Sequence, residues 1–421
     1  MRAHARGYLT PLALALALLP TAIHAAQAPA ATAAASDIEE LVVFGRGETR
    51  QVQTVNGEQI RQLPPGTSPL KALEDLPGVD FQSADPYGAY EWSTRISVRA
   101  FNQNQLGFTL DGVPLGDMSY GNLNGLHVSR AVISENVGRV VLSQGTGALG
   151  TASTSNLGGT LEFLTADPAD ELGVRASVTG GSEDSRRIHG RFDSGRFGPD
   201  TRLTLSYVDQ EADKWKGDGV QEQRQANIKL VQPAGHATIT GCYTWSDRAE
   251  QDYQDLSLHI IARNGEDTDN FFPDWNGAVA AANACAAAAF SAPICDDSYW
   301  NASGLREDHL AYLGIELPIV EGVITKATMY THESEGQGQW GTRYTPTPGG
   351  APLSVRTTEY EIERAGIVTS LAWTLGDHEI SGGLWYEDND FEQARRFYGE
   401  PHVAAPTRSF LDFQNNPFFT Q

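Results

Sequence analysis

Residues 137–163 read VGRVVLSQGTGALGTASTSNLGGTLEF, and this stretch decides how the first half of the chain folds. Apolar, strand-forming residues stand at both ends, and the middle is rich in glycine. Gly145 and Gly147 suit turns and close approaches of the backbone. The stretch therefore predicts a strand, a glycine-rich loop and a closing strand. A phosphate-binding loop is excluded because no GK[ST] sequence and no following helix are present.

Two earlier stretches extend this prediction toward the N-terminus. Residues 70–81, LKALEDLPGVDF, predict a short helix that ends in a strand. Residues 95–117, RISVRAFNQNQLGFTLDGVPLGD, predict two strands with a tight turn at Asp111 and Gly112. In that turn Gly112 would supply a positive φ, and Asp111 would bond nearby backbone. We therefore expect an α/β domain over residues 51–167.

From about residue 170 onward, apolar and polar residues alternate strictly. In TRLTLSYV, residues 201–208, Leu203, Leu205 and Tyr207 share one face of an extended chain. The same rhythm recurs in ATITGCYTWSD, AGIVTSLAWTL and EISGGLWYED. A period of two predicts β-strands with one apolar and one polar face.

Two architectures fit such strands. A soluble sandwich buries the apolar faces, whereas a membrane barrel turns them outward to lipid and encloses a polar interior. The segments are about ten residues long, often end in Trp or Tyr, and are joined by short turns alternating with long polar loops, as in outer-membrane barrels. The longest loop is expected over residues 249–306. The pattern favours the barrel and leaves the sandwich as the alternative.

The N-terminus has the features of a secretion signal. Arg2 and Arg6 precede the apolar run 12–19, and small residues follow. Residues 1–26 are therefore predicted to be a signal peptide. The linker that follows, residues 27–50, carries the strand-prone segment DIEELVVFGRG at 37–47.

Taken in order, these pieces resemble a TonB-dependent outer-membrane receptor. The segment EELVVFG is similar to the family's TonB box, and LPGV, I-x-V-R-x-F, LDGVP and V-V-L-x-x-G…G…GGT-L-x-F are similar to its plug motifs. Ala100 stands where the family usually has glycine. The resemblance implies a mainly β fold: a signal peptide, an α/β plug over 51–167, and antiparallel transmembrane β-barrel strands over 168–421.

The resemblance also implies a function, namely uptake of a scarce solute such as a ferric siderophore or similar chelate. An inner-membrane energy-transducing protein of the TonB type would recruit the box as an added β-strand and pull on it. The box comprises Glu40, Leu41, Val42, Val43 and Phe44. Further partners would be outer-membrane lipid and the small-molecule ligand. The alternatives are a secreted sandwich or adhesin that binds without transport, and a non-functional remnant.

The ligand would meet the loops at the apex of the plug. Aromatic and amide side chains there suit an amphipathic ligand, and an arginine suits an anionic chelate. The candidates are Tyr87, Tyr90, Trp92, Arg95, Asn102, Gln103, Asn104 and Tyr120. Packing of these side chains against the barrel wall is the alternative interpretation.

Charge and cysteine content limit the remaining functions. The formal net charge of −23 argues against nucleic-acid binding, which needs a basic face. Cys285 and Cys295 lie ten positions apart in an alanine-rich, loop-like region, which predicts a disulfide in an oxidising compartment, with two free thiols as the alternative. No catalytic constellation and no metal-ligand spacing stand out, so we expect neither an enzyme nor a cofactor or metal site.

The length of the chain conflicts with a complete receptor. The residues after 167 suffice for about eight to ten strands, whereas plugged transporters use about 22. We therefore expect an incomplete barrel, as in a fragment or an interrupted gene. The final NNPFFTQ, residues 415–421, is expected to be a loop.

Overall fold

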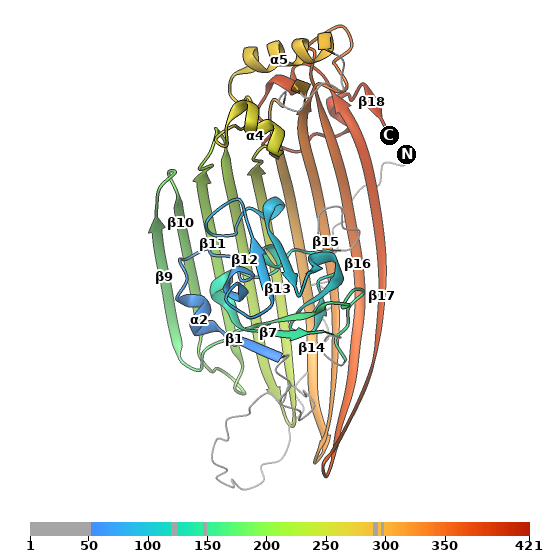
Figure 1. The fold of residues 1–421 in the computed structure, drawn as a ribbon. Helices are drawn as coiled ribbons and strands as arrows, with labels where there is room; N and C mark the ends of the chain where they lie inside the picture. The colour runs from blue at the N-terminus through green and yellow to red at the C-terminus, as the bar shows by residue number, and fades with distance from the viewer. Residues whose placement is uncertain (1–51, 119–124, 146–149, 289–293, 296–298) are drawn as a thin grey trace. The chain divides into compact units, whose positions relative to one another are not determined.

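The structure is a computed structural model that describes residues 52–118, 125–145, 150–288, 294–295 and 299–421. The predicted box at 40–44 lies outside the described residues, as do Tyr120 and Gly147. Figure 1 shows the order of the elements, from blue at the N-terminal end to red at the C-terminal end.

The α/β region, residues 52–165, contains two small sheets. The larger has the strand order β1-β7-β8-β5-β6, in which β5 and β8 run parallel, and the smaller has the order β2-β3-β4. The predicted strand–loop–strand over 137–163 is confirmed as β7 and β8. The elements are β1 (Val52–Asn56), α2 (Gly57–Arg61), η1 (Lys71–Leu73), β2 (Val79–Gln82), η2 (Glu91–Ser93), β3 (Arg95–Val98), β4 (Phe101–Asn102), η3 (Gln103–Gln105), β5 (Leu106–Leu110), β6 (Val113–Pro114), α3 (Val128–Ala131), η4 (Ser134–Asn136), β7 (Val137–Gln144) and β8 (Gly159–Thr165).

A tight turn joins β5 to β6 at the expected place. Asp111 and Gly112 both have positive φ, 49° and 81°, which an Asp-Gly pair adopts readily. The carboxylate of Asp111 accepts a hydrogen bond from the Thr165 backbone N–H at 2.8 Å, so the turn is tied to the end of β8. Gly145, directly after β7, also has a positive φ of 93°.

The rest of the described chain forms one antiparallel sheet in sequence order, from β9 to β18 (Figure 1). Its ten strands agree with the eight to ten expected. The strands are β9 (Leu172–Gly180), β10 (Arg186–Ser194), β11 (Arg202–Asp213), β12 (Val220–Ala234), β13 (Ala237–Gln251), β14 (Ala302–Val320), β15 (Val323–Thr342), β16 (Ser354–Leu375), β17 (His378–Tyr398) and β18 (Phe419–Thr420).

The two faces of this sheet have opposite environments. Leu205 and Tyr207 are 40% and 45% exposed, whereas Ser206 between them is only 5% exposed. The buried face is polar and packs on the α/β region, where the hydrogen bonds of Asn227 to Ile133 and Asn136 join the two. A sandwich would bury the apolar face, so that alternative is wrong. The arrangement is that of a partial membrane barrel.

Several strands are longer than the ten residues that the sequence suggested. β16 has 22 residues and β17 has 21. The expectation failed because the backbone ladder continues into segments dominated by polar and charged residues, such as TTEYEIER in β16. Polarity alternation marks where a strand meets lipid, and it does not mark where the strand ends.

The long connection between β13 and β14 is not a simple loop. It contains α4 (Leu258–Asn264) and α5 (Trp275–Ala288), and α5 includes the alanine-rich stretch that was expected to be loop. Alanine is the strongest helix former, which explains the difference. A disulfide joins Cys285, in α5, to Cys295. Cys242 is a free thiol on β13.

The C-terminal segment also departs from expectation. Phe419 and Thr420 form β18, which pairs with Phe397 and Arg396 of β17, so the end of the chain is not a free loop. Two short turns, η6 (His402–Ala404) and η7 (Phe413–Asn415), precede it. Within the described ranges, no helix combines the length and the apolar character needed to cross a membrane.

Candidate functional site

Side-chain hydrogen bonds to the backbone hold the apex segment, residues 83–95, in shape. Asp85 accepts hydrogen bonds from the backbone N–H groups of Tyr87, Ala89 and Tyr90 at 2.9–3.0 Å. Such side-chain-to-backbone bonds fix a turn that has no helix or sheet partner. The segment therefore presents its aromatic side chains from an ordered backbone.

A pocket of about 200 Å³ lies between the apex segment and two loops of the large sheet. One loop joins β11 to β12, and the other follows β13. The lining residues are Ala84, Tyr90, Trp92, Ser93, Arg95, Trp215, Lys216, Tyr253, Gln254, Asp255 and Leu256.

Aromatic rings form much of the pocket wall. Tyr90 and Tyr253 meet edge to face with ring centroids 5.3 Å apart, and Trp215 lies 6.0 Å from Tyr253. The indole N–H of Trp215 donates to the backbone oxygen of Ala84 at 2.6 Å, so the sheet's loop is bonded to the apex segment. On the other side Trp92 meets Trp340 of β15 edge to face at 6.1 Å.

The charged residues of the pocket are two cations and one anion. Arg95 is exposed, and its guanidinium donates to the backbone oxygens of Trp92 and Thr94 at 2.5 and 2.9 Å. The ammonium of Lys216 lies 5.5 Å from the Trp215 ring centroid. Asp255 carries the negative charge. A pocket with aromatic faces and an excess of positive charge suits an anionic ligand with flat or apolar parts.

Directly behind the pocket, Glu91 enters a buried ionic network. Arg130 of α3 donates to Glu91 at 2.8 Å and also pairs with Asp308 of β14. Arg306 and Arg248, from the sheet, lie 3.5 and 4.0 Å from the Glu91 carboxylate. The network therefore joins the apex segment to the inner face of the sheet through charges whose pairing is needed to offset their burial.

The pKa values of nearby groups reflect this burial. Burial alone would raise the pKa of Glu91, but the guanidinium groups around it outweigh that effect and hold the pKa well below its usual range. Burial lowers the pKa of His127, which precedes α3, to about 4. Burial raises the pKa of Asp252, just beyond β13, to about 7.

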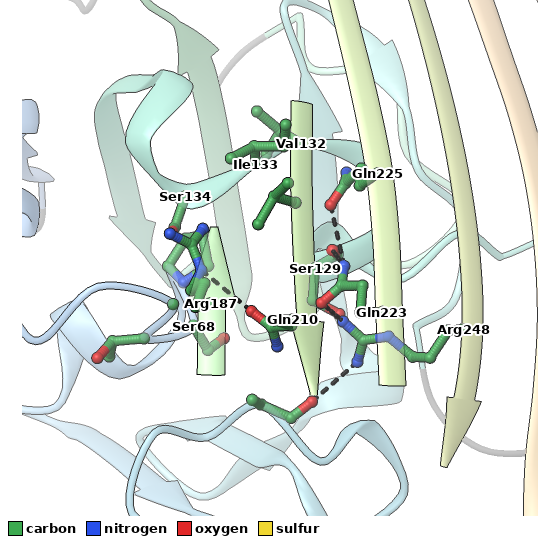
Figure 2. A pocket seen from close by; sticks show the side chains of 15 residues that line it. Ser68, Ser129, Val132, Ile133, Ser134, Arg187, Gln210, Gln223, Gln225 and Arg248 are labelled. Carbon is green, nitrogen blue, oxygen red and sulfur yellow. Dashed lines mark hydrogen bonds between the residues drawn. The ribbon is translucent and has the colours of Figure 1, made fainter. Parts of the chain in front are cut away.

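A second, smaller cavity lies between the α/β region and strands β10 to β13 (Figure 2). Its volume is about 30 Å³, which leaves room for a water molecule or two and for no larger ligand. The Arg248 guanidinium donates to Gln223 at 2.6 Å, and Arg187 donates to Gln210 at 3.1 Å (Figure 2). These paired side chains make the cavity a packing feature.

The structure brings together three of the candidate apex residues: Tyr90, Trp92 and Arg95. Asn102 and Asn104 are exposed and do not line the pocket. Gln103 is buried, where its side chain bonds to the backbone of Ile96 and Met118.

Tyr87 also lies outside the lining, although its backbone belongs to the apex turn. Sequence reasoning missed Trp215, Lys216 and Tyr253. The signal was there in the aromatic residues just beyond β11 and β13, but aromatic residues at strand ends equally suit a membrane interface.

Among the described residues, no group of three His, Cys, Asp or Glu side chains is arranged to hold a metal ion.

Comparison with known proteins finds a family model for the α/β region and similar solved structures for the fold. Residues 46–160 match the family model of the TonB-dependent receptor plug domain. No curated protein matches the chain. Three similar solved structures are the unliganded ferric citrate transporter FecA, the siderophore receptor PiuA from Acinetobacter baumannii, and the ferripyoverdine receptor of Pseudomonas aeruginosa bound to ferripyoverdine.

The likeness to these structures concerns the fold. FecA is 14% identical, with a TM-score of 0.60 over 83% of this chain and 48% of its own. PiuA is 12% identical, with a TM-score of 0.58 over 82% of this chain and 46% of its own. The ferripyoverdine receptor is 13% identical, with a TM-score of 0.58 over 90% of this chain and 48% of its own.

The chain thus spans about half the length of the receptors it matches. Its α/β region matches the plug-domain model, and its large sheet has the fold of part of their barrel wall. Residues 46–160 thus match the plug domain of TonB-dependent receptors, and the described strands that follow have the fold of part of a receptor β-barrel.

Proposed function

We propose that the chain binds an anionic chelate, of the ferric siderophore or ferric citrate class, in the apex pocket, as a step in TonB-dependent uptake. The observation that carries this proposal is the pocket of about 200 Å³ that the plug apex and the sheet's loops build together. Similar solved structures include receptors for ferric citrate and ferripyoverdine.

The chemistry of the lining supports this ligand class. Iron chelates are often anionic and often carry flat aromatic or conjugated donor groups. Trp215, Tyr253 and Trp92 offer ring faces and edges for stacking. Arg95 and Lys216 offer positive charge, and an arginine fork binds carboxylates well.

Release inward would require a pull on the plug. The segment 40–44 is rich in strand-forming residues and follows an alanine-rich linker, so a TonB-type partner could add it as a β-strand. The domain organisation we propose is a signal peptide at 1–26, a linker with this box at 27–50, the plug at 51–167 and barrel strands from 168.

A deletion experiment tests the transport part of the proposal. Cells that produce the full chain would be given ferric citrate or an iron(III)–catechol complex with radiolabelled iron. Deletion of residues 38–44 should preserve binding and abolish uptake, whereas deletion of residues 28–34, a matched change in the same linker, should preserve both. Uptake that survives loss of 38–44 would show that this segment is not the site on which the TonB-type partner pulls.

A second experiment tests the pocket. Trp215→Ala should weaken binding of the better iron probe by about tenfold or more, as expected for an aromatic anchor. Tyr386→Ala, on the outer face of β17 and 68% exposed, serves as the matched aromatic control and should bind as the wild type does. Equal binding by both variants would refute the pocket assignment. Absence of both binding and uptake in the wild-type chain would favour a non-functional remnant.

A further inference from the structure

The loop between β11 and β12 contains a lysine whose charge is completely buried. The side chain of Lys214 is 0% exposed. Its ammonium donates to the Asp269 carboxylate at 2.5 Å, to the Asp252 backbone oxygen at 2.9 Å and to the Asp218 backbone oxygen at 3.4 Å. The charge therefore sits in a cradle of oxygens from three parts of the chain, as a bound cation would.

Asp269 holds the other side of this cradle. Its second carboxylate oxygen accepts hydrogen bonds from the backbone N–H groups of Gln254 and Asn270 at 2.7 and 2.9 Å. The side-chain amide of Asn270 donates to the Asp252 oxygen at 3.2 Å, next to the ammonium. The Lys214–Asp269 pair thus ties the β11–β12 loop to the segment that follows β13.

Two glycines fit the loop closely around this pair. Gly217 has a φ of 70°, and a Cβ there would lie 2.2 Å from a carboxylate oxygen of Asp269. Gly219 has a φ of 134°, and a Cβ there would lie 3.0 Å from the Lys214 side chain. The sequence KWKGDG therefore provides both the charge and the space that the cradle needs.

The tied segments carry the aromatic wall of the apex pocket. Trp215 is the next residue after Lys214, and its backbone N–H donates to the Tyr253 hydroxyl at 3.2 Å. The Lys214 ammonium also lies 4.9 Å from the Tyr253 ring centroid. Both aromatic residues line the pocket, whereas Lys214 and Asp269 do not.

We propose that Lys214 is a positioning residue whose buried ammonium, held by Asp269, fixes Trp215 and Tyr253 in the arrangement that accepts an anionic chelate. When the pocket wall is already ordered in the free protein, ligand binding loses less conformational entropy, and the affinity is higher. This inference rests on the proposed function of the pocket and adds the ion pair that orders its aromatic wall. The lysine acts as a tethered internal cation, so an external amine of matching size can replace it.

The test uses the full chain in detergent with Lys214→Ala. Binding of ferric citrate and of an iron(III)–catechol complex is followed by quenching of tryptophan fluorescence. We expect affinity for the better probe to fall about tenfold, because the loops must then be ordered on binding. Propylammonium, which replaces the three carbons and the nitrogen that the substitution removes, should restore most of this affinity.

Two further variants separate positioning from general damage. Asp269→Asn keeps the side-chain size but removes the counter-charge, so it should lose similar affinity and gain nothing from propylammonium. Lys326→Ala, which removes an exposed lysine paired with Glu316 at 2.8 Å, should bind like the wild type with or without the amine. Wild-type affinity in Lys214→Ala, or a loss that propylammonium leaves unchanged, would overturn the proposal.

A readout that needs no ligand distinguishes failure of this inference from failure of the proposed function. Trypsin cleavage after Lys216 reports local opening of the β11–β12 loop. We expect Lys214→Ala to raise this cleavage rate about tenfold and propylammonium to reverse the change. If the wild-type chain binds neither iron probe but the cleavage rates behave as described, Lys214 does fix the β11–β12 loop, and the proposed ligand class is wrong. An unchanged cleavage rate in Lys214→Ala would refute the positioning role of Lys214.

Discussion

Ala100 occupies a backbone conformation that suits glycine. Its φ is 66°, and that of Arg99 before it is 49°, so the chain makes a left-handed bend between β3 and β4. The resemblance to the receptor family had marked this position as one where glycine is usual. A Cβ in the left-handed region costs about 1–2 kcal/mol, which explains that preference.

Ala100→Gly should therefore stabilise the plug. We expect a gain of about 1 kcal/mol in the free energy of unfolding, the relief of strain being partly offset by the greater freedom of glycine in the unfolded chain. Denaturant unfolding of the full chain in detergent micelles measures the gain. Ala100→Ser keeps a Cβ and is the matched control, so stabilisation by serine as well would contradict the strain argument.

His127 should make plug stability depend on pH. Burial lowers the pKa of its imidazole to about 4, against about 6.5 in an unfolded chain. Between these values the unfolded state binds more protons, so stability falls as pH falls. From pH 7 to pH 5 the loss attributable to His127 should be about 2 kcal/mol.

The measurement is the difference between wild type and His127→Gln in unfolding free energy at pH 7 and pH 5. The variant should lose less stability than the wild type, because it has no imidazole to protonate. His259→Gln removes an exposed histidine and should keep the wild-type slope. Parallel pH dependence in wild type and His127→Gln would argue against the assignment.

At the scale of elements, the disulfide fixes α5 to the chain that follows it. Cys285 is buried in the last turns of α5, and Cys295 is buried too. The double variant Cys285→Ser/Cys295→Ser should lose about 2–4 kcal/mol of local stability, since the bridge restricts the open segment. Hydrogen exchange of the α5 amides should speed up accordingly. Amides of β1, in the plug, serve as the internal control and should exchange at the wild-type rate.

The sequence predicted the elements unevenly, and the reasons are physical. β7, β8 and the Asp111–Gly112 turn are encoded locally, by strand formers and by residues that tolerate positive φ. The sequence over α5 predicts a loop because its alanines form no amphipathic stripe, although each alanine favours a helix. Local sequence patterns therefore predict an element best where one local property, such as strand propensity or tolerance of a positive φ, determines its structure.

The pocket was only half predictable for a similar reason. Tyr90, Trp92 and Arg95 are close in sequence and belong to one segment, residues 83–95, so they could be proposed together. Trp215 and Tyr253 join them only when the sheet folds around the plug, and nothing near them in the sequence records that contact. The buried partners of Glu91 on β13 and β14 were beyond prediction on the same ground.

At the scale of the whole molecule, the polarity of the large sheet leads to a test in the membrane. Leu205, in the middle of β11, faces outward and pairs with Phe192 and Ile228 on neighbouring strands. Leu205→Arg should destabilise the inserted protein by about 2–4 kcal/mol, because it places a charge at the depth of the lipid tails.

The matched control places the same charge near the membrane edge. Leu172, the first residue of β9, is 72% exposed, and Leu172→Arg should cost about 0–1 kcal/mol. Reversible unfolding in lipid bilayers compares the two variants. Equal costs at the two depths would contradict an outward-facing, lipid-embedded surface.

The hydrogen bond from the Trp215 indole to the Ala84 backbone oxygen has a consequence for the proposed uptake. It joins the β11–β12 loop to the apex segment, and both line the pocket. A pull that displaced the plug would therefore separate the two sides of the binding surface. In the proposed uptake, the movement that opens a path inward would also break the ligand site, so no intact pocket would remain to bind the ligand again.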